Sequence, residues 1–203
     1  MKAFLLAAGK GTRLKPYTDH TPKCLIPIQG KPLLQIWIGL FEQYGIHEVL
    51  INVHFHADQV LTWIEKHQPE TPVHMTPFVE PRLLGSAGTL WARRDFVCDE
   101  EAFVIAYADN LTNINLERMI AFHRHIQLSG GIFTMGLFRS PNPRACGIAS
   151  FDSNFRILSF VEKPIEPGSD LANAGIYVSS GELFDRFPSE VYRFSSEVLD
   201  LGY

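Results

Sequence analysis

The residues best suited to chemistry begin with a glycine-rich segment, GKGTRLKPYT, at positions 9–18. Gly9 and Gly11 carry no side chains, so their backbone amides can approach an anion closely. Arg13 adds a planar fork of donors, and Lys23 adds a mobile positive charge. The pattern therefore predicts a site for phosphate groups. It is not a Walker A loop, which needs Lys-Ser/Thr directly after its last glycine, nor the dinucleotide fingerprint of three spaced glycines.

Oxygen ligands follow a continuous apolar run, AFVIAYA, at positions 102–108. Asp109 and Asn110 come at its end, where a carboxylate is poorly explained by packing because burial of an unpaired charge costs free energy. Carboxylates suit Mg²⁺, which takes one or two of them together with substrate phosphates. We therefore expect Asp109 to be a magnesium ligand. The alternative is that Asp109 or Asn110 forms a turn or caps the next helix.

A third segment, LLGSAGTL at positions 83–90, carries Gly85, Ser86 and Gly88 at the head of an expected helix. Small residues there let a flat ligand pack against exposed backbone, as a nucleobase would. The alternative is an ordinary helix start capped by Ser86, which explains the serine but not both glycines.

The elements that must position these residues alternate along the first half of the chain. Apolar runs predict strands at 2–7, 48–53, 72–79 and 102–108, and helical periodicity predicts helices at 32–44, 56–67 and 86–95. This alternation of strands and helices predicts an α/β fold. Its sheet should be doubly wound and Rossmann-like, with the ligand at the carboxyl ends of the strands.

The alternation of strands and helices ends in the second half of the chain. After a helix at 115–128, strands are expected at 131–139, 146–151, 156–161 and 173–178, with a short helix at 181–187. Short connections between these strands predict hairpins or an extra antiparallel layer that covers the first half and binds a second substrate.

Composition limits the class of protein. The chain has 203 residues, 46% of them hydrophobic and 20% charged, which favours one globular domain, 1–203, with a mainly nucleotide-binding half (1–112) and a second half (113–203).

No apolar run approaches the roughly 18 residues of a membrane span. The net charge of −4 offers no general attraction to nucleic acid or an anionic membrane. Three scattered cysteines favour reduced thiols, so we expect a cytoplasmic protein.

Taken together, GKGTRLKPYT and the following TPKCLIPIQGKPLL (21–34) resemble the signature of the sugar-1-phosphate nucleotidyltransferases. ACGIASFD (145–152), FVEKP (160–164) and NAGIYV (173–178) resemble the sugar-binding motifs of that family and occur in the family's order. The likeness is greatest to the mannose-1-phosphate guanylyltransferase branch. Ala108 departs from it, because the family usually has glycine before the aspartate.

The resemblance implies a reaction, NTP + sugar 1-phosphate → NDP-sugar + pyrophosphate, with Mg²⁺ as cofactor and with GTP and a mannose- or heptose-type phosphate favoured. Thymidylyl, uridylyl and cytidylyl transfer stay open, since one or two hydrogen bonds decide among bases. A non-catalytic, nucleotide-sugar-sensing subunit on the same fold is the alternative from another class. Members of the family often form homo-oligomers, so the resemblance leaves a homo-oligomer of this chain open.

The resemblance also assigns residues. The expected catalytic pair is Arg13 and Lys23. Nucleotide contacts are expected from Leu6, Ala7, Ala8, Gly9, Gly11, Thr12, Gly85, Ser86 and Gly88. The sugar phosphate is expected to meet Asp109, Asn110, Gly147, Glu162, Lys163, Asn173 and Tyr177, with Asp109 also the metal ligand. Taken singly, Glu162 and Lys163 would read as a surface pair and Asn173 as a turn residue.

Members of the family also carry a second metal-binding aspartate in an Asp-x-Gly-Thr setting nearer their C-terminus. This chain reaches Tyr203 before any such motif, and Asp200, in VLDLGY, is only a weak candidate for that ligand. The sequence thus predicts a chain without the usual C-terminal end, and weaker binding of Mg²⁺.

Overall fold

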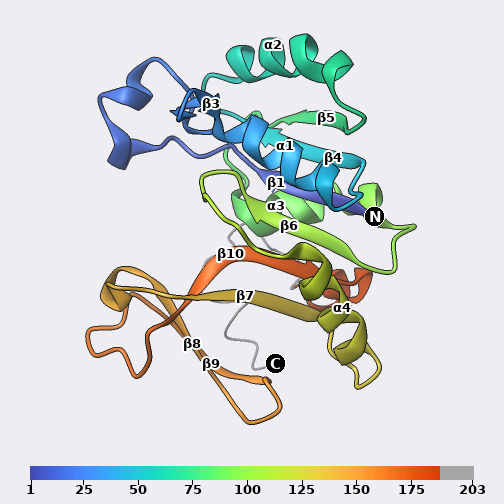
Figure 1. Ribbon diagram of the computed structural model, residues 1–203, viewed down its shortest axis with the longest axis vertical. Helices are drawn as coiled ribbons and strands as arrows, with labels where there is room; N and C mark the ends of the chain where they lie inside the picture. The colour runs from blue at the N-terminus through green and yellow to red at the C-terminus, as the bar shows by residue number, and fades with distance from the viewer. Residues whose placement is uncertain (188–203) are drawn as a thin grey trace.

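The structure is a computed structural model and describes residues 1–187 (Figure 1). Its main sheet has the strand order β5-β4-β1-β6-β10-β8-β9, and β7 also pairs with β10. The strands are β1 (Lys2–Leu6), β4 (Glu48–Val53), β5 (His74–Val79), β6 (Phe103–Tyr107), β7 (Phe133–Arg139), β8 (Gly147–Phe151), β9 (Ile157–Glu162) and β10 (Leu171–Ser179). The helices are α1 (Leu33–Gln43), α2 (Ala57–His67), α3 (Gly85–Ala92) and α4 (Leu116–Gln127).

The first half is the predicted parallel sheet. β1 lies between β4 and β6, and β5 follows β4, all of them parallel. β1, β4 and β6 are buried along most of their length because both of their faces are covered, whereas the edge strand β5 alternates between buried and exposed residues. Along β1, Ala3 and Leu5 pack into one core, whereas Phe4 and Leu6 pack into the other.

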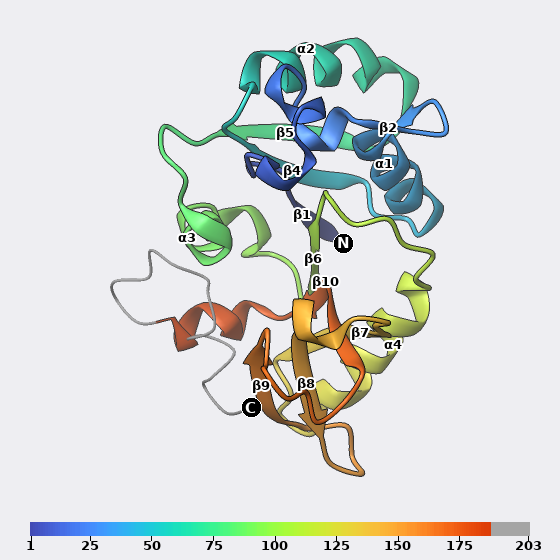
Figure 2. The ribbon, with the colours of Figure 1, turned by 90° about the vertical axis from the view of Figure 1, so that its left-hand side faces the viewer.

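Helices cover the two faces unequally. The core that contains Ala3 also takes side chains from α1, α2 and α4, and the core that contains Phe4 takes them from α3 and from the short helix Gly181–Arg186. Figure 2 shows α3 on one side of the sheet and α1 and α4 on the other. The doubly wound α/β prediction is confirmed.

The antiparallel strands of the second half extend the same sheet; they do not form a separate layer over the first half. The hairpin β8–β9 points away from α2 (Figure 2). β10 makes the junction, because its end (Ile176–Ser179) pairs antiparallel with β6 while its start pairs with β8 at Ala172. The predicted antiparallel second half with hairpins is therefore confirmed. The alternative of a layer that covers the first half is wrong, because a sheet that continues edge to edge satisfies the backbone groups of β6 that a separate layer would leave open.

β7 runs beside β10 on its other side, and the pairing shifts between Asn173 and Tyr177. Gly175, in this irregular stretch, has φ +66°. An ideal Cβ there would lie 2.5 Å from Asn110 Nδ2 and 2.8 Å from Tyr107 Cδ2. Only glycine fits this close approach of β10 to the end of β6.

The segment between β1 and α1 is a long connection made of short pieces. Three 3₁₀ turns (Thr12–Leu14, Tyr17–Asp19 and Lys23–Leu25) are followed by a small hairpin of β2 (Pro27–Ile28) and β3 (Lys31–Pro32). Within residues 1–187 no helix is both long enough and apolar enough to cross a membrane.

Candidate active site

The phosphate loop, residues 7–14, leaves β1 at the carboxyl edge of the parallel sheet. Gly9 is exposed, and no atom lies within 4 Å of the position a Cβ would take. Within the described chain, the amides of Gly9 and Lys10 donate to no other residue. Exposed, unpaired amides at a place with room for a ligand are what an oxyanion requires.

Thr18 holds the shape of this loop. Gly11 adopts φ +63°, and its ideal Cβ would lie 2.8 Å from Thr18 Cγ2 and 3.2 Å from Lys23 Cβ. The buried Thr18 hydroxyl donates to the Gly11 carbonyl at 2.9 Å. The loop therefore packs against the turn that carries Lys23, and the glycine makes that contact feasible.

Lys23 and Asp109, 86 positions apart in the chain, form an ion pair between Nζ and Oδ2. The pair joins the phosphate loop region to the end of β6. Their side chains are 25% and 42% exposed, so solvent and a ligand can reach both. Arg13 and Thr12 lie on the same loop and are at least partly exposed, and Arg13 makes no ion pair with any described residue. The structure thus brings together two predicted charged residues that lie far apart in the sequence.

The predicted nucleobase segment begins α3. Gly85 is exposed with φ +72°, whereas Gly88 is buried inside the helix. Ser86 does not cap the helix, because the N-cap residue is Leu84 and no side chain caps it. The Ser86 hydroxyl lies instead 2.7 Å from the Tyr107 hydroxyl. The capping alternative is therefore wrong, and the surface open to a flat ligand is that of Gly85 and Ser86.

Asn110 ties the end of β6 to the irregular part of β10. Its Nδ2 donates to the Ala174 carbonyl at 2.7 Å, and its own carbonyl accepts from Trp37 Nε1 at 3.0 Å. α4 is capped by Asn115, which accepts from Arg118 N at 2.9 Å, so neither Asp109 nor Asn110 caps it. Asn110 does close a turn through its amide to Tyr107 O at 3.2 Å, as the turn alternative expected.

The irregular stretch itself holds two further predicted residues. Asn173 Nδ2 donates to the Tyr177 hydroxyl at 2.7 Å, and Asn173 Oδ1 accepts from the Gly175 amide at 2.8 Å. Tyr177 is buried and packs against Tyr107 and Phe133. Asn173 and Tyr177 therefore lie beside the end of β6, next to Asn110.

The remaining predicted residues lie on the β8–β9 pair. Gly147 faces Glu162 across the strands, and its ideal Cβ would overlap Phe160 at 2.2 Å and Glu162 Oε2 at 2.8 Å. Lys163 has φ +48°, donates its amide to Cys146 O at 3.0 Å, and places Nζ 3.4 Å from Glu162 Oε1. Both charged side chains are more than half exposed.

Tyr107 lies among the predicted site residues, in contact with Ser86 and Tyr177, and the sequence analysis did not single it out. Burial raises the pKa of its phenol, the Ser86 hydrogen bond opposes this, and the charges of Asp109 and Glu162 raise the pKa further. Burial likewise raises the pKa of Tyr177, with a smaller contribution from Glu162. Both phenols stay neutral, and the charge of Glu162 raises the pKa of both. The sequence signal that could have identified Tyr107 is its position at the end of β6, two residues before Asp109.

The donor set accommodates a hard cation at Asp109. This carboxylate is exposed at a strand end, beside a loop with unpaired amides, and Mg²⁺ accepts one carboxylate plus substrate phosphates. Residues 1–187 contain no cluster of three or more His, Cys, Asp or Glu side chains able to enclose a metal ion alone. Asp200 lies outside the described residues.

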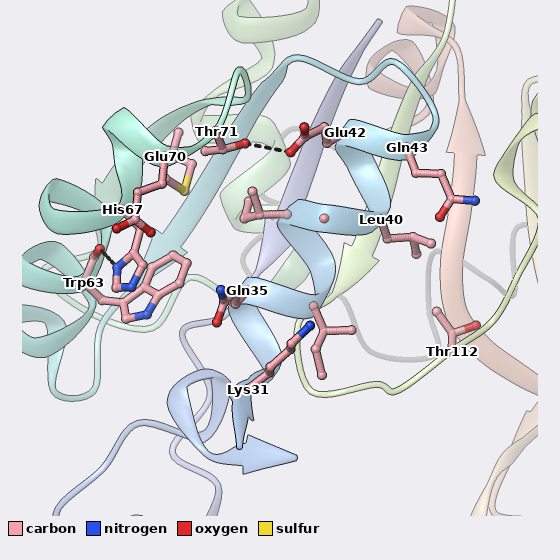
Figure 3. Close-up of a pocket in the computed structure, with 14 residues that line it drawn as sticks. Lys31, Gln35, Leu40, Glu42, Gln43, Trp63, His67, Glu70, Thr71 and Thr112 are labelled. Carbon is pink, nitrogen blue, oxygen red and sulfur yellow. Dashed lines mark hydrogen bonds between the residues drawn. The ribbon is translucent and has the colours of Figure 1, made fainter. Parts of the chain in front are cut away.

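A separate pocket of about 480 Å³ lies between α1 and α2 (Figure 3). Its lining includes Trp63, His67 and Glu42, and none of the predicted site residues. Several of its polar groups already pair with one another or with backbone: Thr71 donates to Glu42 at 3.2 Å, and the His67 ring contacts the Trp63 carbonyl at 2.7 Å. The candidate site is thus the open edge where β1, β6 and β10 meet.

Comparison with protein families finds one model, described as nucleotidyl transferase, that matches residues 2–201. A UTP–glucose-1-phosphate uridylyltransferase of Synechocystis is 32% identical, over 93% of this chain and 51% of that protein. The β catalytic subunit of mannose-1-phosphate guanylyltransferase from Dictyostelium discoideum is 28% identical, over 98% of this chain and 55% of that protein. The chain spans about half the length of the curated relatives it matches.

Solved structures share the fold. A Bacillus anthracis protein described as a putative glucose-1-phosphate thymidylyltransferase superposes with a TM-score of 0.84 at 26% identity, covering 98% of this chain and 80% of that one. HddC from Yersinia pseudotuberculosis, solved with GMP-PN, gives a TM-score of 0.82 at 21% identity, covering 100% of this chain and 86% of that one.

Proposed function

Because the chain belongs to the nucleotidyl transferase family, we propose that it transfers a nucleotidyl group from an NTP to a sugar 1-phosphate and releases pyrophosphate. The observation that carries the proposal is the ion pair of Lys23 and Asp109, which joins a loop of free amides to the end of β6. A nucleotide-triphosphate site needs such a meeting of backbone donors, a cation and a carboxylate.

The reaction needs little proton chemistry. The attacking oxygen of the sugar phosphate is already an anion, so no general base is required. The difficulty is to bring two polyanions together for in-line attack on the α-phosphorus, from which pyrophosphate departs as the P–O bond to it breaks. Positioning and charge neutralisation therefore account for most of the catalysis.

The residues divide this work by position. The amides of Gly9 and Gly11 bind the triphosphate, and Arg13 holds the phosphates that leave as pyrophosphate. Lys23 turns from Asp109 to the α-phosphate, and Asp109 becomes free to ligate Mg²⁺. Bound Mg²⁺ supplies positive charge to the triphosphate. Gly85 and Ser86 form the surface for the base.

The acceptor half lies across the edge of β6. Lys163 binds the phosphate of the sugar 1-phosphate, and Glu162, Asn173 and Tyr177 face its hydroxyl groups. The neutral phenol of Tyr177 suits this contact, because a phenolate would repel the acceptor phosphate.

We favour GTP and a mannose- or heptose-type phosphate. Support comes from relatives named as mannose-1-phosphate guanylyltransferases in Dictyostelium, Arabidopsis and fission yeast, at 28–29% identity. A uridylyltransferase at 32% identity keeps UTP and glucose 1-phosphate as the second choice.

The test is pyrophosphate release by the purified chain with Mg²⁺, for GTP, UTP, CTP and dTTP each crossed with mannose, glucose and heptose 1-phosphates. One productive pair, with a turnover that Lys23→Ala lowers at least about 10²-fold, establishes the activity and names both substrates. Release that needs no sugar phosphate would contradict the proposal, since it would mean simple hydrolysis.

A nucleotide-sugar-sensing subunit is the second candidate. It is favoured by one observation: within residues 1–187 the metal position has one carboxylate and no acidic cluster around it. Silence across the whole grid, with NDP-sugar binding detected by calorimetry, would support this second function over transfer.

A further inference from the structure

A buried carboxylate lies between the two nucleotide-contacting segments. Glu80 follows β5 directly and is 2% exposed, and the side chains that donate hydrogen bonds to it carry no charge. Burial of an ionised carboxylate is costly unless hydrogen bonds compensate. Such a group calls for a structural or functional reason.

Three donors surround this carboxylate. Oε1 accepts from Asn52 Nδ2 at 2.8 Å and from the Thr89 hydroxyl, and Oε2 accepts from the Leu84 amide at 3.0 Å. Asn52 and Thr89 are themselves 4% and 0% exposed. The network is therefore closed to solvent, and each of its members depends on the others.

The network ends at both nucleotide segments. Asn52 Oδ1 accepts from the amide of Ala7, the first residue of the phosphate loop, at 2.6 Å. Leu84 lies in the nucleobase segment, directly before Gly85, where α3 begins. From these contacts we infer that Glu80 is a positioning residue, which holds the phosphate loop and the nucleobase segment at a fixed separation. The inference rests on the proposed function.

Apolar packing alone would not set this geometry. The hydrogen bonds fix the direction of two backbone amides, Ala7 N and Leu84 N, on either side of where a nucleotide would lie. A triphosphate and its base form one ligand of limited reach, so a change in that separation weakens NTP binding and leaves the acceptor half untouched.

The donors and acceptors of the network can be reversed. In Glu80→Gln, the new NH₂ group meets another donor, either the Asn52 side-chain amide or the Leu84 backbone amide. In Asn52→Asp, the new carboxylate lies against the carboxylate of Glu80. In the double variant N52D/E80Q, the new amide at position 80 can donate to the new carboxylate at position 52 and accept from the Leu84 amide. The carboxylate at position 52 still accepts from the Ala7 amide. Donor and acceptor numbers match again, at unchanged net charge.

The experiment is a double-mutant cycle on the full chain. It measures Kd for GTP with Mg²⁺ by calorimetry without sugar phosphate, and KM for NTP and for the sugar phosphate in the productive pair. Each single variant is expected to weaken GTP binding about tenfold or more, as an unsatisfied buried group does. The Kd of the double variant for GTP should return to within about threefold of wild type, because the new pair restores the partners that each single change removes. KM for the sugar phosphate should change less than about twofold in all three variants, because the network does not reach the acceptor half.

Thr134→Val is the matched control, because it removes a buried hydrogen bond (to His123, at 2.9 Å) on the strand β7, away from the nucleotide segments. It should lower the melting temperature but leave Kd for GTP unchanged. The inference is overturned if the single variants bind GTP as tightly as wild type, if the double variant is no better than the singles, or if Glu80→Gln changes which NTP is preferred, since the carboxylate would then contact the base itself.

The experiments distinguish failure of the proposed transfer activity from failure of the role inferred for Glu80. A wild type that binds GTP without turnover contradicts transfer, and the binding cycle still decides the role of Glu80. A wild type that binds none of the four NTPs overturns both.

Discussion

Lys23 and Asp109 lie at the centre of the candidate site and neutralise each other while it is empty. A partly exposed ion pair of this kind contributes at most about 1 kcal/mol to folding, because solvent screens it and two side chains lose freedom. Its position at the end of β6 is thus better explained by ligand binding than by stability.

Lys23→Ala and Asp109→Asn should therefore separate activity from folding. Each variant is expected to lower kcat/KM for nucleotidyl transfer by about 10²–10³-fold, the usual loss for one preorganised charge. The melting temperature should shift by no more than about 4 °C. Lys66→Ala, an exposed lysine in the last turn of α2, is the control and should change neither value. Near-wild-type turnover in both site variants would remove these residues from the mechanism.

Gly175 carries a second prediction. Gly175→Ala forces an alanine into φ +66° with its Cβ against Asn110 and Tyr107. Strain and displacement of Asn110 should cost about 2 kcal/mol or more, a fall of at least about 4 °C in melting temperature. Gly168→Ala, at an open position with ordinary φ, should stay within about 2 °C of wild type. Equal melting curves for the two variants would contradict the close approach.

Helix α4 and strand β7 are joined by a buried histidine. His123 Nδ1 contacts the Thr134 hydroxyl at 2.9 Å, and Nε2 has no partner within the described chain. Burial lowers the pKa of His123 from 6.5 to about 4. The folded state thus resists a proton that the unfolded state accepts, so this contribution to stability is complete above pH 6.5 and is lost as the pH falls towards 4.

Urea unfolding at about pH 7 and about pH 5.5 measures this loss. Wild type should lose about 1 kcal/mol more over that interval than H123L/T134V, in which nothing titrates at the site. The other titratable groups, the remaining histidines above all, contribute equally to both proteins and cancel in the comparison. Parallel losses would show that His123 does not stay neutral in the folded protein.

At the scale of elements, periodicity predicted nearly all of the structure. Every predicted strand and long helix is present within a few residues, because apolar runs such as 102–108 have one way to be buried on both faces. The joining of the two halves into one sheet was not predictable. It depends on β10, whose partners β6, β7 and β8 are set by long-range contacts that no local pattern records.

The candidate site was predictable where chemistry and resemblance point to the same residue, as for Lys23 and Asp109. The sequence analysis missed Tyr107, Asn52 and Thr89, which meet only when β4, β6 and α3 pack together. Gly88 has the same local signal as Gly85 but lies inside α3. Composition at a helix start does not state which glycine faces the solvent.

For the whole molecule, the two halves share one sheet and should unfold in one transition that a ligand displaces as a unit. GTP with Mg²⁺ at about 100 times its Kd should add about 2.7 kcal/mol of stability, raising the melting temperature by about 5–10 °C. Differential scanning calorimetry measures both the shift and the number of transitions. Two transitions, with only one moved by the ligand, would mean that the halves fold independently.

The central place of β10 also bears on how the chain folds as it is synthesised. β6 and β7 are made well before residues 171–179, and each lacks its β10 neighbour until those residues leave the ribosome. During that interval the open edge of β6 is a template for wrong pairing, and the non-local contact that closes it forms slowly. A pause or a break in translation just before residue 171 should therefore leave an aggregation-prone intermediate, whereas one well after residue 179 should release a chain that already holds every strand of residues 1–187.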